Sequence, residues 1–336
     1  MTYGIPDYRL PQDILEREIH NIERAGVNII LNTKVGKDIT FNSLRKKYDA
    51  IFIGIGAQKA LQLEITGEDL EGVYHGLDFL KRHFLHRDLD FTGKKVAVIG
   101  GGNTAIDSAR TAIRLGAREV VILYRRTLED MPADKNEIKD AMEEGVKIHT
   151  LANPSEFLGV DGKLRYIIVK KQQMGKFDSS GRRRAVSTGE TFIEDFDVAI
   201  AAISQTPDTA FLKDKLELNG ARVAADHFTM ATSMPGVFVG GDAHRGPEDI
   251  VNAVYEAKVA AAGIDKYLGG QGVLYKGFDQ EITDYHIEGD IVPHNRFLTR
   301  QVEAEEAVGS FRERNLGMHE LDARAEASRC LRRDRR

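Results

Sequence analysis

The sequence contains a single cysteine, Cys330, among 336 residues. One cysteine excludes a disulfide within the chain and a redox centre built from a cysteine pair, and it cannot ligate an iron–sulfur cluster without help from another chain. Disulfides form and persist in oxidising compartments, so the scarcity of cysteine favours the cytoplasm.

Long apolar runs and a strong charge of one sign are also absent. No run approaches the roughly 20 apolar residues that a helix needs to span a bilayer, and residues 1–9 lack the basic-then-apolar pattern of a secretory signal. The net charge is −5, from 47 basic and 52 acidic residues. We therefore expect a cytoplasmic protein without a membrane span and without a nucleic-acid partner.

What the sequence does contain is a glycine turn between a strand and a helix. An apolar strand pattern runs into GGGNTA at positions 100–105, and a helical pattern follows over 106–115. This order is typical of a dinucleotide-binding βα unit, in which Gly100 forms the tight turn, Gly102 lets the backbone approach a diphosphate, and Ala105 allows close packing. The diphosphate lies at the helix N-terminus, where free N–H groups favour an anion.

The flanking residues favour this interpretation over a flexible glycine loop. The helical pattern ends at Gly116, and a second apolar strand follows over 120–124, as a βαβ unit requires. That strand ends in Arg125 and Arg126. An acidic residue at this position would accept a hydrogen bond from the ribose 2′-OH of NADH, whereas an arginine accommodates the 2′-phosphate of NADPH. The sequence therefore favours NADPH; a solvated arginine pair, or one paired with nearby acidic residues, is the alternative.

The first ninety residues predict a further α/β region. Apolar spacing over 12–25 predicts a helix that stops at Gly26. The apolar runs 27–31 and 49–56 predict strands of a parallel sheet. Neither run is followed by a phosphate-binding glycine turn.

Downstream of the glycine turn the pattern changes from alternating helices and strands to a hairpin. The predicted elements are a helix over 138–142 and strands over 146–149, 164–171 and 192–203. The last two segments flank a polar loop at 175–189, which is typical of an antiparallel hairpin that leads into a buried strand. The arginines at 182–184 in that loop fit a solvated tip better than a phosphate site.

The last part of the chain predicts one more strand–turn–helix unit and a polar extension. Residues 235–242 form a strand pattern closed by Gly241 and Asp242, and an alanine-rich helix follows over 250–264. An aspartate at such a turn is more often a helix cap than a ligand contact. Residues 271–336 predict an extended segment with a basic, partly helical end, either for interaction or solvated.

Four motifs occur in this order along the chain: YGIPDYRLP at 3–11, GGGNTAID at 100–107, YRRT with MPA within 124–133, and GVFVGGD at 236–242. Together they resemble the small subunit of NADPH-dependent glutamate synthase and its flavoprotein relatives, over residues 1–268. The resemblance implies an α/β fold with Rossmann-like FAD- and NAD(P)-binding domains. An NADPH domain, 93–207, is then inserted in a partial FAD domain, 1–92 and 208–270, and 271–336 form a C-terminal extension.

The resemblance also assigns cofactor-binding residues. It implies that the NADPH diphosphate is held by Gly100, Gly102, Asn103, Thr104 and Ala105. It implies that Arg125 and Arg126 bind the 2′-phosphate, and that Gly241 and Asp242 meet the FAD, the carboxylate accepting from a ribityl hydroxyl. The segments 54–57 and 202–207 match the two crossings at strand ends into which such folds thread the cofactors.

The departures from the family pattern concern the flavin side. The family's FAD domain normally opens with its own Gly-x-Gly-x-x-Gly strand, preceded by a cysteine-rich iron–sulfur segment, and this sequence contains neither. Its FAD site is therefore incomplete. Near Cys330 the relatives often have Cys-Leu-x-Cys-Asp, whereas this sequence has Cys-Leu-Arg-Arg-Asp, so a cluster-ligand role is not expected.

The function implied is an oxidoreductase that passes hydride from NADPH to FAD and electrons to a partner subunit that carries the acceptor or iron–sulfur clusters. The alternative is a truncated or split NADPH-binding subunit without redox activity of its own. We assign no catalytic acid or base and no metal site. The histidines, including His83 and His86, fit helix-surface positions better than metal ligands.

Overall fold

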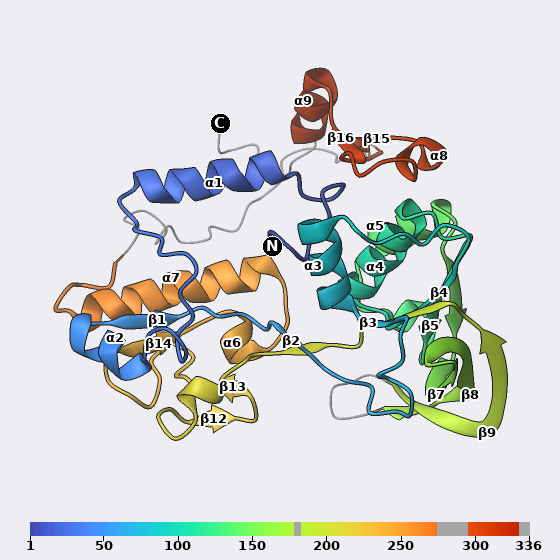
Figure 1. Ribbon diagram of the computed structural model, residues 1–336. Helices are drawn as coiled ribbons and strands as arrows, with labels where there is room; N and C mark the ends of the chain where they lie inside the picture. The colour runs from blue at the N-terminus through green and yellow to red at the C-terminus, as the bar shows by residue number, and fades with distance from the viewer. Residues whose placement is uncertain (178–182, 274–294, 329–336) are drawn as a thin grey trace.

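A five-stranded parallel sheet organises the middle of the chain (Figure 1). The computed structural model describes residues 1–177, 183–273 and 295–328. The spatial order of the strands is β3 (Val73–His75), β10 (Val198–Ala201), β4 (Lys95–Ile99), β5 (Glu119–Tyr124) and β6 (Lys147–Thr150). Valine, isoleucine and leucine fill the three central strands because parallel sheets are buried on both faces.

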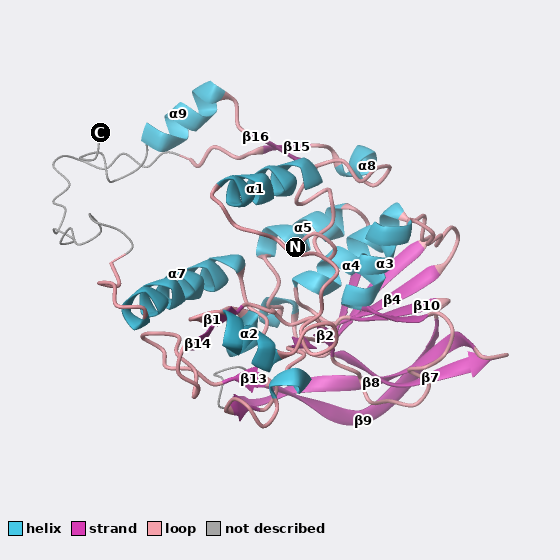
Figure 2. Cartoon of the chain, turned by 60° about the vertical axis from the view of Figure 1, so that its left-hand side comes forward, coloured by secondary structure: helices cyan, strands magenta, loops and turns pink. Residues whose placement is uncertain are grey.

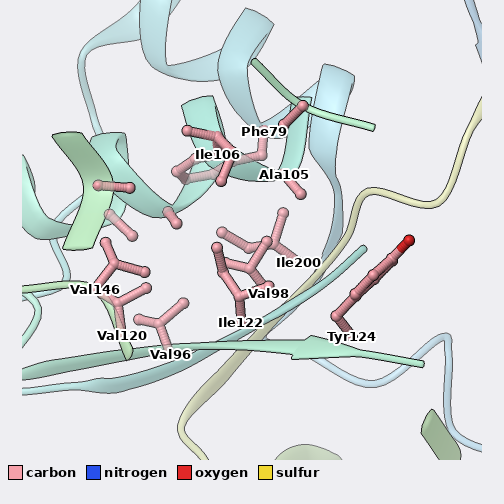
Figure 3. Packing of buried hydrophobic residues seen from close by; sticks show 14 of the residues in the cluster. Phe79, Val96, Val98, Ala105, Ile106, Val120, Ile122, Tyr124, Val146 and Ile200 are labelled. Atoms are coloured by element: carbon pink, nitrogen blue, oxygen red, sulfur yellow. The ribbon is translucent and has the colours of Figure 1, made fainter. Parts of the chain in front are cut away.

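Three helices cover one face of this sheet: α3 (Gly76–His86), α4 (Asn103–Arg114) and α5 (Lys135–Glu143). Their apolar sides meet the strands in a core where Phe79, Val98, Ile106 and Ile122 are fully buried (Figure 3). Helix α4 ends as predicted at Gly116, whose φ of +87° is strained for any residue with a side chain.

The opposite face is covered by an antiparallel sheet (Figure 2). Its strands are β7 (Ala152–Val160), β8 (Lys163–Phe177) and β9 (Arg183–Asp195). The hairpin was predicted, but its loop was predicted too long, because β8 and β9 pair from Phe177 with Arg183 to Tyr166 with Asp195. The segment 192–203 is divided between two elements, since β9 ends at Asp195 and β10 is the buried strand that was predicted to follow the hairpin.

The predicted arginine cluster at 182–184 lies partly on β9. Arg182 lies outside the described residues, whereas Arg183 and Arg184 are exposed strand residues. The Arg183 guanidinium donates to the carbonyl oxygens of Met174 and Gly175 on β8, at 3.0 and 3.2 Å. Arg183 thus fastens the hairpin, in agreement with the solvated-tip interpretation.

A second lobe is built on a single pair of parallel strands, β1 (Ile51–Ile53) and β14 (Val237–Val239). The elements around this pair are α2 (Phe41–Lys47), the 3₁₀ helix η2 (Ala210–Leu212), the hairpin β12 (Leu218–Asn219) with β13 (Arg222–Val223), α6 (Asp242–Arg245) and α7 (Ile250–Tyr267). Helix α1 (Gln12–Arg24) precedes them in the chain and lies apart from the pair (Figure 2). The core of this lobe contains Phe41, Ile53, Leu212 and Val237.

The predicted strand over 27–31 is wrong. These residues have no strand assignment, and Ile30 and Leu31 are 63% and 74% exposed. The apolar composition suits a strand, but a strand also needs a neighbouring strand to satisfy its N–H and C=O groups. No neighbouring strand is present for this segment in the described part of the chain.

Two short strands join the lobes. β2 (Lys59–Ala60) follows the segment 54–57, and β11 (Gln205–Thr206) lies within 202–207. They pair antiparallel, Lys59 with Thr206 and Ala60 with Gln205. The two passages between the lobes therefore lie side by side; the predicted domain limits at 92 and 207 stay a prediction.

The C-terminal segment folds back onto α4 and α5. Its elements are β15 (Arg300–Gln301), α8 (Ala304–Ala307), β16 (Asn315–Gly317) and α9 (Glu320–Ser328). The solvated alternative is wrong at Arg314, which is buried against α5, and the predicted partly helical end is present as α9. The remainder of the predicted basic end, 329–336, lies outside the described residues.

Candidate dinucleotide site

The glycine turn after β4 combines one forbidden side chain with one open space. Gly100 has φ +142°, and a Cβ there would lie 2.2 Å from the carbonyl oxygen of Ala202, so only glycine fits. A Cβ on Gly102, by contrast, would meet nothing within 4 Å. The turn at the carboxyl end of β4 is thus closely packed at Gly100 and open at Gly102, which is the arrangement predicted for a diphosphate site.

Helix α4 begins directly at this open space. Gly102 is its N-cap, and no side chain caps it among the described residues. The first N–H groups of a helix have no partner within the helix and favour an anion. Ala105 is fully buried against the sheet, as predicted for close helix–strand packing. Thr104 lies beside Gly76, whose Cβ position is 3.0 Å from the Thr104 Cγ2.

The loop after β5 holds the glycine turn in place. The Ala133 N–H donates to the Gly101 carbonyl at 3.1 Å, and the Asp134 N–H donates to the Asn103 Oδ1 at 3.1 Å. The Tyr124 ring fills the space over Gly101, where a Cβ would lie 2.5 Å from the ring. The predicted MPA motif therefore has a structural role, and the side-chain amide oxygen of Asn103 already accepts a hydrogen bond from the protein.

The two arginines at the end of β5 have different environments. Arg125 is exposed, whereas Arg126 is 7% exposed and lies beside Tyr124. The following 3₁₀ helix η1 (Leu128–Asp130) begins with a capping box, in which the Asp130 carboxylate accepts from the Thr127 N–H at 3.3 Å. Arg125 is thus the arginine most available to a ligand phosphate.

The second predicted turn, Gly241–Asp242, lies in the other lobe. Gly241 has φ +65°, and Asp242 opens the four-residue helix α6. Its Oδ1 accepts from the Glu248 N–H at 3.2 Å, and burial raises the pKa of the carboxyl above its ordinary value. In the described residues no hydrogen bond or ion pair joins this turn to residues 100–105.

The sequence analysis missed Glu256, which supports the Gly241 turn. Glu256 is fully buried on α7, accepts from the Gly241 N–H at 2.7 Å, and pairs with Arg245. An acidic residue on a helix rich in alanine and valine was the available signal. Helix α7 also has a cap that the sequence analysis did not assign, because the Asp249 carboxylate accepts from the Asn252 N–H at 2.7 Å at the start of this helix.

The analysis also missed a buried arginine–carboxylate cluster behind α4. Asp107 on α4 binds the Arg9 guanidinium through both carboxylate oxygens, at 2.8 and 2.9 Å. Glu144, after α5, accepts from Arg110, Arg114 and Arg314, and the Tyr8 ring lies 4.0 Å from the Arg114 guanidinium. The cluster therefore ties the YGIPDYRLP motif and the C-terminal segment to the helix that begins at the glycine turn.

The prediction of a helix-surface position holds for His86 but is wrong for His83. His83 is buried, and its ring stacks on Phe311 at 4.5 Å. Burial, assisted by Arg87, lowers the pKa of His83 to about 4, so the ring is neutral at pH 7. In the described part of the chain no group of three or more His, Cys, Asp or Glu residues is arranged to hold a metal ion.

These features define a class of protein. A parallel sheet with a Gly-x-Gly-x-x-Ala turn, an open helix N-terminus and an arginine at the end of the adjacent strand is a Rossmann-type dinucleotide-binding domain. The match of a family model to residues 12–257 makes the assignment more specific. The chain belongs to the pyridine nucleotide-disulphide oxidoreductase family.

Known relatives confirm the resemblance. The chain is 38% identical to the putative NADPH glutamate synthase small chain of Cereibacter sphaeroides, over 82% of this chain and 69% of the relative. It is 40% identical to the beta subunit of the NADP(+)-dependent formate dehydrogenase of Moorella thermoacetica, over 99% of this chain and 49% of that protein. The chain thus spans about half the length of some curated relatives that it matches.

Solved structures show the same fold. FprA of Mycobacterium tuberculosis, in a complex with NADPH, superposes with a TM-score of 0.67 at 21% identity, over 80% of this chain and 74% of FprA. This likeness confirms the predicted α/β architecture. Among the described residues, no helix is both long enough and apolar enough to cross a membrane.

Proposed function

We propose that this chain binds NADPH and belongs to a flavoprotein oxidoreductase of the glutamate synthase small-subunit type. The observation that supports this most directly is the open space at Gly102, in front of the uncapped N-terminus of α4. Gly102, Asn103 and Thr104 would hold the diphosphate with backbone N–H groups. Gly100 and Ala105 give the turn and the packing that place those groups.

The adenosine end of the cofactor is assigned to the end of β5. Arg125 is exposed there, and a planar guanidinium pairs well with a phosphate. Arg126 would contribute from its buried position beside Tyr124. This arrangement favours the 2′-phosphate of NADPH over the free hydroxyl of NADH.

The flavin side fits its cofactor only in part. Gly241 and Asp242, supported by Glu256, form a strained turn suited to a ribityl hydroxyl. The sheet behind them has two strands, and apolar residues such as Leu31 and Val251 are 74% and 77% exposed. Soluble proteins seldom leave so much apolar surface uncovered, so we propose that polypeptide outside this sequence completes the FAD site.

When bound, FAD would accept hydride from the nicotinamide and release electrons singly. The side chains described here bind and orient the nucleotides. A partner subunit is proposed as the holder of the acceptor or iron–sulfur clusters, by analogy with relatives named as beta subunits or small chains. The proposed location is the cytoplasm, in agreement with the single cysteine.

The two-stranded sheet favours a second candidate, a split NADPH-binding subunit without redox activity of its own. The two candidates differ in what the purified chain does with FAD. The first expects flavin absorbance near 450 nm to remain with the protein after gel filtration, and NADPH to bleach it. The second expects NADPH binding without retained flavin.

Isothermal titration with Arg125→Ala tests NADPH binding itself. A charge-assisted hydrogen bond contributes about 1.5–3 kcal/mol, so we expect NADPH affinity to fall roughly 10- to 100-fold while the weaker NADH affinity stays the same. Arg184→Ala, an exposed arginine on the hairpin, is the matched control. Unchanged NADPH affinity in Arg125→Ala would contradict the assignment of this strand end.

A further inference from the structure

The order of the strands fixes the direction in which a dinucleotide lies. From β4 the chain passes through α4 to β5 on one side, whereas β10 and β3 lie on the other side of β4. This reversal is a topological switch point, and ligands of open α/β sheets lie there, across the carboxyl ends of the strands. With the diphosphate over Gly102 and the 2′-phosphate at Arg125 on β5, the nicotinamide extends over the ends of β10 and β3.

His75 is the last residue of β3, at that end of the sheet. It pairs in register with Ala201, the last residue of β10. Its neighbour Gly76 is in close contact with the glycine turn, because a Cβ there would lie 3.0 Å from both the Ala202 Cβ and the Thr104 Cγ2. His75 is therefore one residue away from the cradle of the diphosphate.

The backbone at His75 is held firmly. Tyr74 packs on Phe79 and Phe91, with ring centroids 6.2 Å apart in both pairs, on the helical face of the sheet. Since side chains alternate along a strand, His75 lies on the opposite face from Tyr74. Gly76 leaves little room for a side chain beside Ala202 and Thr104, so the backbone that follows His75 is closely packed.

The Nδ1 atom of His75 is buried, and it has no hydrogen-bond partner among the described residues. The great majority of buried side-chain polar atoms have a partner, so such an atom needs an explanation. The residues that end β10 beside it, Ala201 and Ala202, have no polar side chain. His75 also opens α3 without capping it through its side chain.

We propose that the His75 Nδ1 hydrogen-bonds the carboxamide group of the bound nicotinamide ring. This assignment rests on the proposed function, since it requires a nicotinamide dinucleotide at the 100–105 turn. The bond selects the rotation of the ring about its ribose, and so it decides which face of the ring is presented for hydride transfer. The signal in the sequence was a polar residue between an apolar strand and a glycine.

The test compares two ligands that differ only in the nicotinamide: NADP⁺ and 2′-phospho-ADP-ribose. Their dissociation constants are measured by isothermal titration for the wild-type chain, His75→Leu and His75→Asn. Loss of one hydrogen bond corresponds to roughly a 3- to 10-fold change in affinity. We expect His75→Leu to weaken NADP⁺ by that factor, to leave 2′-phospho-ADP-ribose unchanged, and His75→Asn to recover most of the NADP⁺ affinity.

His86→Leu, at the exposed end of the same helix, is the control and should change neither constant. Equal weakening of both ligands in His75→Leu and His75→Asn would indicate a distorted strand end and would overturn the assignment. Unchanged NADP⁺ affinity in His75→Leu would overturn it as well. If the wild-type chain bound neither ligand, the proposed function would fail, and the assignment with it.

Discussion

Glu144 offers the sharpest test of how the C-terminal segment is attached to α4 and α5. Its carboxylate is 0% exposed and accepts hydrogen bonds from Arg110, Arg114 and Arg314. Two of these arginines lie on α4, and Arg314 comes from the C-terminal segment. Replacing Glu144 with Gln keeps the volume but leaves three buried or half-buried guanidinium groups without their common counter-charge.

The size of the effect follows from the pKa of the group. Burial alone would raise the pKa of Glu144, but hydrogen bonds from Arg114 and Arg110 outweigh it and lower the pKa from 4.5 to about 2. A lowering of this size corresponds to about 3 kcal/mol of folding free energy. That contribution is present above pH 4.5 and is lost as the pH falls toward 2. Breaking a buried ion pair by removal of one partner costs a similar amount, about 3–5 kcal/mol.

Urea unfolding at pH 7 measures the loss, with Glu143→Gln as the matched control. Glu143 binds the same Arg314 at 2.7 Å, but its side chain is 40% exposed. Exposed pairs contribute about 1 kcal/mol or less. We expect Glu144→Gln to lose at least twice as much free energy of unfolding as Glu143→Gln, with the gap narrowing below pH 4.5. Equal losses at pH 7 would refute the reasoning.

Two further predictions concern α4. Gly102→Val should abolish NADPH binding in titration without lowering the melting temperature, because the new side chain enters open space. Gly100→Val should lower the melting temperature, because its side chain would collide with Ala202. A lowered melting temperature in Gly102→Val would contradict this. Burial raises the pKa of Asp107 to about 7 despite Arg9, so the folded chain keeps a proton that the unfolded chain loses near pH 4. The stability that this group contributes is present below pH 4 and is lost as the pH rises to 7. The free energy of unfolding should therefore change less between pH 5 and pH 8 in Asp107→Asn than in the wild-type chain. An equal change in both would count against the raised pKa.

Local patterns predicted the dinucleotide half of the molecule well. The turn at Gly100 and the helix-terminating Gly116 after α4 each depend on a few consecutive residues, and the structure confirms both. The close approach of Ala202 to Gly100 explains why the first glycine is required. No local pattern indicated that the contact comes from a residue about a hundred positions away.

The failures share a physical cause, because each depended on a distant neighbour. The run 27–31 has the composition of a strand but lacks a strand to pair with among the described residues. His83 was expected at a helix surface, yet Phe311 covers it. Arg314 was expected in a solvated segment, yet Glu144 neutralises it. Periodicity reports which residues prefer burial, and it does not report what buries them.

The pairing of β2 with β11 has a mechanical consequence. Two hydrogen-bonded passages of the chain bend together, so a swing of one lobe against the other requires torsion of both at once. Sideways displacement would break the pairing of Lys59 with Thr206, whereas twisting about the line of the pair preserves it. The joint between the lobes is therefore a pair of coupled passages, and any turn of one lobe against the other must change the conformation of both.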